Sequence, residues 1–402
     1  MEISLKDIPE YLKKSELYRS FLRNSEDLNE KIEINPNHNK KDINIQSFDD
    51  LCIYLDIYRY WNLDESVKDL FYDYVKNNEI NEDCITYLKI NFQELELIEE
   101  FQYINKKTLG ACNFAVEKGN LYLLKYLHKN GYPWNNLTCK KAANNLNCLI
   151  YLHENRCPWD GYTTSNASLN GHYDCLRYAH ENGCPWDSET CINAIKNGHL
   201  NCLKYSHENG CYWYEMTCEI AADMDQLECL KYAHENGCPW DEYTCANASE
   251  KGYLDILKYA HENNCPWDKT TCNSAAKGGH LECLKYAHEN GCPWNADTCT
   301  SAALGGHLDC LKYAHENECI WNDLTCAMAA SKGHLDCLQY AHENGCPWNQ
   351  ITSKYAMQNG HIDCLKYACE NGCPFVPTKY LEEKKRFECI KYLYEYHQNQ
   401  KK

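Results

Sequence analysis

The chain has 402 residues and a formal net charge of −18, from 40 Lys and Arg against 58 Asp and Glu. No stretch approaches the roughly 20 apolar residues that a membrane span needs, and residues 1–10 lack the apolar core of a signal peptide. The acidic balance argues against a nucleic-acid partner, because contacts to a phosphate backbone need clustered Lys and Arg. We therefore expect a cytoplasmic protein with no membrane and no nucleic-acid partner.

The 29 cysteines could suggest a disulfide scaffold. Such scaffolds belong to short secreted chains, however, and this chain is long and shows no export signal. We therefore expect reduced thiols in a cytosol-like compartment.

Residues 1–107 carry no repeat and predict a small domain followed by a linker. The expected elements are a short strand at 2–5, helices at 8–22, 48–60 and 64–75, an Asn-rich loop at 34–45, and one or two linking helices at 78–107. We place the domain at residues 1–77 and the linker at 78–107.

This N-terminal region resembles a degenerate BTB/POZ domain, or the related cullin-adaptor fold. The resemblance rests on the segments IPEYLKKSELYRSFL, KIEI and SFDDLCIYLDIYRYWNLDESVKDLFYDYV. It implies an α+β domain that docks a cullin ubiquitin ligase. An unrelated helical cap, which shields the first unit of the following array, is the alternative that the sequence leaves open.

Tryptophans recur from residue 159 onward at intervals of 27 residues. They are Trp159, Trp186, Trp213, Trp240, Trp267, Trp294, Trp321 and Trp348, with Trp134 before them and Phe375 in the next place. A fixed period of this size is typical of a solenoid, in which each repeat packs only against its neighbours. Residues 108–402 therefore predict about ten units and an eroded C-terminal cap that retains Glu388 to Tyr392.

Each unit predicts two short helices, as residues 268–294 show. Asp268 caps the first helix, and Gly278 and Gly279 end it. The second helix begins near His280 and ends at Gly291, two residues before a proline. We expect Leu281, Leu284 and Ala287 to form its buried stripe, and Trp294 to cover the end of the helical pair.

The unit resembles the ankyrin repeat. The resemblance rests on the pattern T-C-x-x-A-A-x-x-G-H-L-x-C-L-K-Y-A-H-x-N-G-C, which matches the family at Thr271, Ala275, Ala276, Gly279, His280, Leu284, Gly291 and Cys292. Cysteine replaces the proline that follows the threonine in the family, and the period is shorter than the family's about 33 residues. The missing residues are those of the β-hairpin finger through which ankyrin proteins often bind. The Cys-Pro-Trp form looks like arrays encoded by large DNA viruses of protists, which would place the protein in the host cytoplasm.

Cysteine and histidine recur in fixed registers of the repeat. Of the 29 cysteines, 26 follow the threonine, precede a helix aliphatic or precede the proline, and no C-x-x-C pair occurs. We expect buried thiols that act as small hydrophobes and no cofactor or metal; a metal-binding or redox-buffering array is the alternative. We expect histidines such as His280 to bond backbone between repeats, and those such as His288 to be half-buried, neutral and hydrogen-bonded. Protonating them near pH 5–6 should destabilise the array.

Positions that vary among the units are free to contact a partner. The third residue after each Trp varies most, and the sixth and seventh vary too; these positions are three or four residues apart and lie on one face of the first helix. Several of them are apolar without need for the fold, and we predict that they bind a partner: Met216, Ile220, Tyr243, Leu324, Met328, Ile351 and Tyr355. Drift on an exposed face would give the same variation, and the sequence leaves both interpretations open.

The sequence contains no G-x-x-x-x-G-K-[ST], H-E-x-x-H or G-x-S-x-G motif. We therefore expect a mainly α protein, an ankyrin-like solenoid of helical pairs preceded by a small α+β BTB-like or helical domain. Its expected function is a non-enzymatic scaffold that binds a partner protein, and as an extension a substrate adaptor for a cullin ubiquitin ligase.

Overall fold

The computed structural model describes residues 109–186, 188–375, 388–389 and 391–393, together with two short strands. Strand β1 (Glu2–Ser4) pairs antiparallel with β2 (Lys31–Glu33), with Ile3 opposite Ile32. This agrees with the strand predicted at 2–5. The predicted N-terminal helices and the linker lie outside the described residues.

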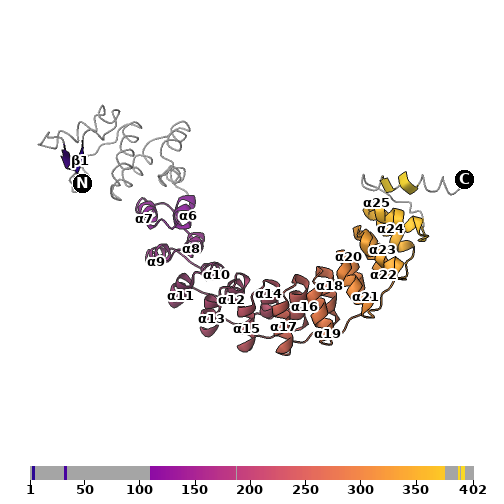
Figure 1. Ribbon diagram of the computed structural model, residues 1–402. Helices are drawn as coiled ribbons and strands as arrows, with labels where there is room; N and C mark the ends of the chain where they lie inside the picture. The colour runs from indigo at the N-terminus through magenta and orange to yellow at the C-terminus, as the bar shows by residue number, and fades with distance from the viewer. Residues whose placement is uncertain are drawn as a thin grey trace. The chain divides into compact units, whose positions relative to one another are not determined.

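The described part of the array is helical throughout, as the sequence predicts, and its helices come in pairs (Figure 1). We call the first helix of each pair A and the second B. The A helices are α6 (Leu109–Glu117), α8 (Asn136–Ala142), α10 (Gly161–Leu169), α12 (Ser188–Lys196), α14 (Thr217–Asp223), α16 (Glu242–Lys251), α18 (Lys269–Gly278), α20 (Ala296–Gly305), α22 (Asp323–Lys332) and α24 (Gln350–Asn359). The B helices are α7 (Leu121–Lys129), α9 (Leu146–Glu154), α11 (Tyr173–Glu181), α13 (Leu200–Glu208), α15 (Leu227–Glu235), α17 (Leu254–Glu262), α19 (Leu281–Glu289), α21 (Leu308–Glu316), α23 (Leu335–Glu343) and α25 (Ile362–Glu370).

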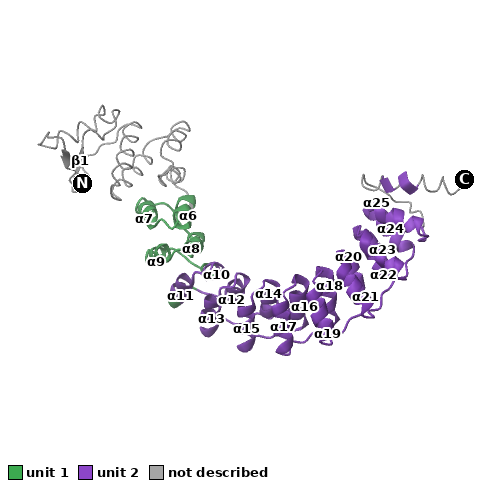
Figure 2. Ribbon diagram, in the orientation of Figure 1, with its two compact units in different colours: residues 1–163, 181–184 green, residues 164–180, 185–402 purple. Residues whose placement is uncertain are grey.

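The chain divides into two compact units, residues 1–163 with 181–184 and residues 164–180 with 185–402, so that the boundary falls within α10 (Figure 2). In the second compact unit, each A helix from α14 to α24 packs closely against its neighbouring A helices, whereas neighbouring B helices make fewer contacts. No helix among the described residues is long and apolar enough to cross a membrane.

Local sequence sets the ends of these helices. The Asp268 side chain accepts a hydrogen bond from the Thr270 backbone N–H at 2.8 Å and caps α18, and Gly279 ends that helix with φ +79°. Helix α19 then begins after His280, and the chain turns at Gly291 with φ +82°. These are the boundaries that the sequence predicts.

The core consists of small side chains. In the pair α18–α19 the fully or almost fully buried residues are Thr271, Cys272, Ala275, Ala276, Cys283, Leu284, Ala287 and Cys292. Their small size allows close helix packing: a Cβ atom on Gly278 of α18 would lie 2.2 Å from the Glu250 carbonyl oxygen of α16. Leu281, predicted to join the buried stripe, is half-buried at its edge.

Candidate binding surface

Cysteines fill the gaps between the helices. All described cysteines are buried, which confirms their predicted role as small hydrophobes. The Cys292 thiol donates to the Asp268 carbonyl at 3.2 Å and so ties the end of its helical pair to the beginning. Burial raises the pKa of Cys283 to about 11, and contact with Cys292 and burial raise the pKa of Cys272. A thiol with a raised pKa, such as Cys283, stays protonated at neutral pH and is a poor metal ligand and nucleophile.

The described residues offer no group of three or more His, Cys, Asp or Glu side chains with the geometry of a metal site. The metal-binding alternative therefore has no set of ligands in this part of the chain. In the unit at residues 268–294, Cys272 and Cys292 from two of the three cysteine registers meet, and no third donor joins them among the described residues.

The histidines of the B helices form a ladder with tryptophan and tyrosine. The His288 ring stacks on Trp294 of its own unit, with centroids 3.7 Å apart, and its Nδ1 lies 3.0 Å from the Tyr313 hydroxyl of the next unit. The same His–Tyr hydrogen bond, at 2.8 to 3.1 Å, joins His128 to Tyr151, His180 to Tyr205, His207 to Tyr232, His261 to Tyr286 and His342 to Tyr367. This confirms the half-buried, hydrogen-bonded imidazole that the sequence predicts.

The other histidine register holds adjacent repeats together. The His334 ring forms a hydrogen bond with the Leu304 backbone carbonyl. A Cβ atom on Gly306 would lie 2.4 Å from Nδ1 of the same ring, so the ring packs directly against the glycine. Burial is the main cause that lowers the pKa of His334, and the neighbouring His307, His361 and Lys332 lower it further. Both histidine registers therefore serve the frame and leave the variable A-helix face for other uses.

The seven predicted partner-binding residues lie on the A helices of the second compact unit or at their ends, in two groups. Met216, Ile220 and Tyr243 lie on or beside α14 and α16, and Leu324, Met328, Ile351 and Tyr355 lie on α22 and α24. Met216, Tyr243 and Leu324 are 45%, 53% and 38% exposed, and the other four are half-buried. Helices α18 and α20 separate the groups and carry polar residues such as Thr270 and Asp297 at the same positions.

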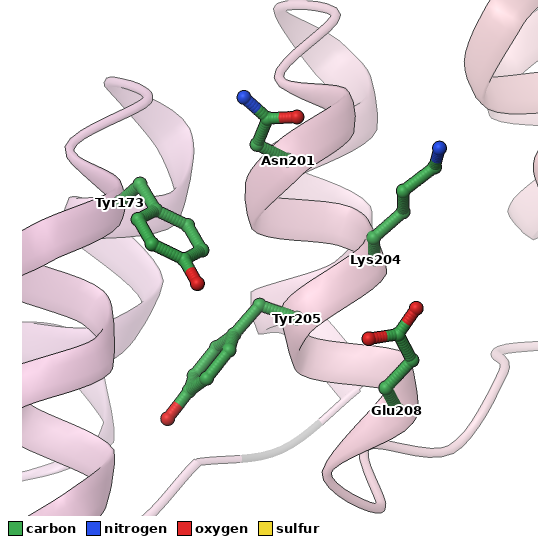
Figure 3. Close-up of a pocket in the computed structure, with 5 residues that line it drawn as sticks. All are labelled: Tyr173, Asn201, Lys204, Tyr205 and Glu208. Atoms are coloured by element: carbon green, nitrogen blue, oxygen red, sulfur yellow. The ribbon is translucent and has the colours of Figure 1, made fainter.

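A shallow pocket of about 240 Å³ lies on the B helices instead (Figure 3). Tyr173 of α11 and Asn201, Lys204, Tyr205 and Glu208 of α13 line it. The Tyr173 and Tyr205 rings meet edge to face with centroids 5.5 Å apart. These residues are not among the predicted binding residues, although Tyr173 stands where other units have Leu or Ile, and that replacement was the available signal.

No family model matches the chain, and no curated protein matches it. Similar solved structures include two crystal structures of the pentatricopeptide repeat protein PPR10 in complex with an 18-nt psaJ RNA element, one of them a triple Cys-to-Ser variant. In both, the identity is 14%, the TM-score is 0.39, and the match covers 83% of this chain and 57% of that chain. The chain thus spans little more than half the length of these proteins.

The predicted exclusion of a nucleic-acid partner does not stand. That exclusion rested on net charge alone, and the solved structures are helical-repeat proteins that hold RNA. Net charge is a sum over the whole chain, whereas single-stranded RNA is recognised locally by stacking and by hydrogen bonds to base edges. The coarse prediction of a helical-pair solenoid stands, while the ankyrin and BTB assignments remain predictions.

Proposed function

We propose that the chain is a non-enzymatic scaffold that holds a partner protein along the A helices of its second compact unit. The observation that carries this proposal is the position of Leu324, Met328, Ile351 and Tyr355. They form an apolar group on the adjacent helices α22 and α24. The packing of the array is made by other residues of these helices, such as Thr325, Cys326, Ala329 and Ala330, which are fully buried.

An apolar group that the frame does not require lowers solubility, unless a partner covers it. Helical-repeat arrays bury their own contacts between neighbouring units and present extended surfaces to ligands. The charged residues of α22 and α24 are few and of both signs: Asp323, Lys332 and Lys354. An apolar surface with a mixed polar rim is typical of contact surfaces between proteins.

The proposal assigns no chemical step to the array. Histidines of both registers are engaged in stacking and hydrogen bonds that recur from unit to unit, and the thiols are buried. The ankyrin-type assignment is the finer form of this proposal and is supported by the T-C-x-x-A-A pattern. Docking of a cullin by residues 1–77 is a separate, finer proposal. A chain without residues 1–107 should lose cullin on co-purification and keep the ligands of the array.

The variants Leu324→Ser and Ile351→Ser, made together, test the binding surface. We expect the full chain to co-purify with a protein that is lost from the double variant, while the circular dichroism spectrum stays unchanged. Asp336→Ser is the matched control, because Asp336 is exposed on the B helix of the same pair. Retention of every partner by the double variant, or partners that nuclease removes and protease does not, would contradict the proposal.

A further inference from the structure

The unit that runs from Tyr214 to Trp240 departs from the repeat at several positions. Tyr214 replaces the Asp or Asn that caps other A helices, and α14 begins after Met216 without a side-chain cap. Asp225 occupies the place of the helix-ending glycine and has φ +57°, a conformation that costs energy for any residue with a side chain. These departures weaken the frame, so the fold does not account for them.

The same departures create an exposed apolar surface. Met216, Ile220 and Met224 follow one another at a spacing of four residues, and each backbone N–H bonds the carbonyl of the preceding member, so the three share one face of α14. Met216 and Met224 are 45% and 41% exposed. In the regular helix α18 the same positions hold Thr270, Ser274 and Gly278.

Two exposed tyrosines come shortly before α14 in the chain, and a third lies on the next A helix. Tyr212, which replaces the proline of the repeat, is 84% exposed, and Tyr214 and Tyr243 are 44% and 53% exposed. We call these residues, with the stripe, the α14 patch: Tyr212, Tyr214, Met216, Ile220, Met224 and Tyr243.

Carboxylates are frequent on and beside α14. Residues 214–226 contain Glu215, Glu219, Asp223 and Asp225 and no Lys or Arg. Lys251 of α16 forms an ion pair with one of them, with its Nζ 3.4 Å from Oδ1 of Asp223. Burial, together with the neighbouring carboxylates Asp241 and Glu242, raises the pKa of Glu219. A cation that arrived here would relieve this repulsion, and the residues around Leu324 and Ile351 show no such excess of acid.

We propose that the α14 patch binds a basic amphipathic segment of a partner protein, with apolar side chains on the methionine stripe and Lys or Arg beside Glu219 and Glu242. This proposal rests on the proposed function and names the chemistry of one of its contacts. Methionine is suited to such a surface because its unbranched side chain adapts to different apolar partners. The apolar contact provides affinity, and the carboxylates select for positive charge.

A fluorescently labelled peptide of Lys and Leu, with Leu at helical spacing, is the direct probe. We expect it to bind the full chain, and the affinity to fall about tenfold in Met216→Ser with Met224→Ser. Glu219→Gln with Glu242→Gln should also weaken binding and reduce its dependence on salt. Glu282→Gln with Glu289→Gln is the charge-matched control, because both residues are exposed on the B helix α19, and it should bind as the unmodified chain does.

Two further probes separate apolar from electrostatic contacts. A Glu and Leu peptide should not bind. A Lys and Ser peptide should bind weakly, equally to the unmodified chain and the Met216 and Met224 variant, and less to the Glu219 and Glu242 variant. Equal affinity of the Lys and Leu peptide for the Met216, Glu219 and control variants would overturn the proposal. In that case, a partner still lost from the Leu324 and Ile351 variant would leave the proposed function intact, so the two failures are distinguishable.

Discussion

The repeats at residues 268–294 and 214–240 share the same buried framework but differ in their exposed side chains. In the first, Asp268 caps the beginning of α18 and the left-handed Gly279 ends it. The positions that correspond to Met216, Ile220 and Met224 hold polar or small residues there. In the second, Tyr214 and Asp225 stand at those two places, and Met216 and Met224 are exposed. Both units bury the same Thr-Cys, Ala-Ala and Cys-Leu pairs. The comparison separates residues that build the solenoid from residues that do not, without an alignment of homologues.

The largest effect should come from the glycines of the regular frame. In Gly306→Ala the new Cβ would meet the His334 ring, in addition to the strain of φ +77°. We expect a loss of about 2–4 kcal/mol in the free energy of unfolding, measured with urea. Gly291→Ala is the matched control, because its φ is +82° but no atom lies within 4 Å, and it should cost about 1 kcal/mol. Equal losses would show that packing of the histidine adds nothing.

The two cysteine registers should respond differently to serine. Cys283→Ser should lose about 2 kcal/mol, because the hydroxyl is buried among apolar side chains, in the register where another unit has Ile256. Cys272→Ser should cost less than 1 kcal/mol. Its register contains Ser353, whose hydroxyl donates to the Pro374 carbonyl at 2.7 Å, so a partner is available. The opposite order of stabilities would refute this assignment of the registers.

Restoring the cap in the irregular unit should raise stability. Tyr214→Asp places a capping carboxylate before α14, and we expect a gain of about 1 kcal/mol in the free energy of unfolding. The same change should weaken binding of the Lys and Leu peptide, because it removes an apolar ring. Asp268→Tyr in the regular unit is the reverse control and should lose stability by a similar amount. A gain in both stability and binding would break the comparison between the two units.

The smallest effect should be a loss of stability in mild acid. Burial lowers the pKa of His172 and His334 in the folded chain below the ordinary 6.5, so the unfolded chain binds more protons as the pH falls. Their contribution is fully present above pH 6.5 and is lost as the pH falls through the lowered values. The melting temperature should therefore be lower at pH 5.5 than at pH 7.5. His334→Asn should reduce this difference, because Asn145 occupies the same register and caps its helix. A melting temperature independent of pH would contradict the assignment.

Much of the frame is predictable because its determinants are local. Asp268, Gly279 and Gly291 fix helix ends by capping and by backbone conformation, and the buried cysteines follow from their registers. The ladder could not be predicted in full, because His288 and Tyr313 are 25 residues apart and meet only through the stacking of units. For the same reason the sequence did not show that Tyr173 lines a pocket together with residues of the next B helix. The excess of acid near Glu219 depends likewise on Asp241 and Glu242 of the next helix.

Site-specific photo-cross-linking in cells tests the central claim most directly, namely that the A helices of the second compact unit bind a partner protein. A benzophenone amino acid is placed at Met216 or Leu324 on the A side and at Glu282 or Asp336 on the B side, all of them exposed. We predict protease-sensitive cross-linked products from the A side and none from the B side. Products from both sides alike, or from the B side alone, would contradict the account.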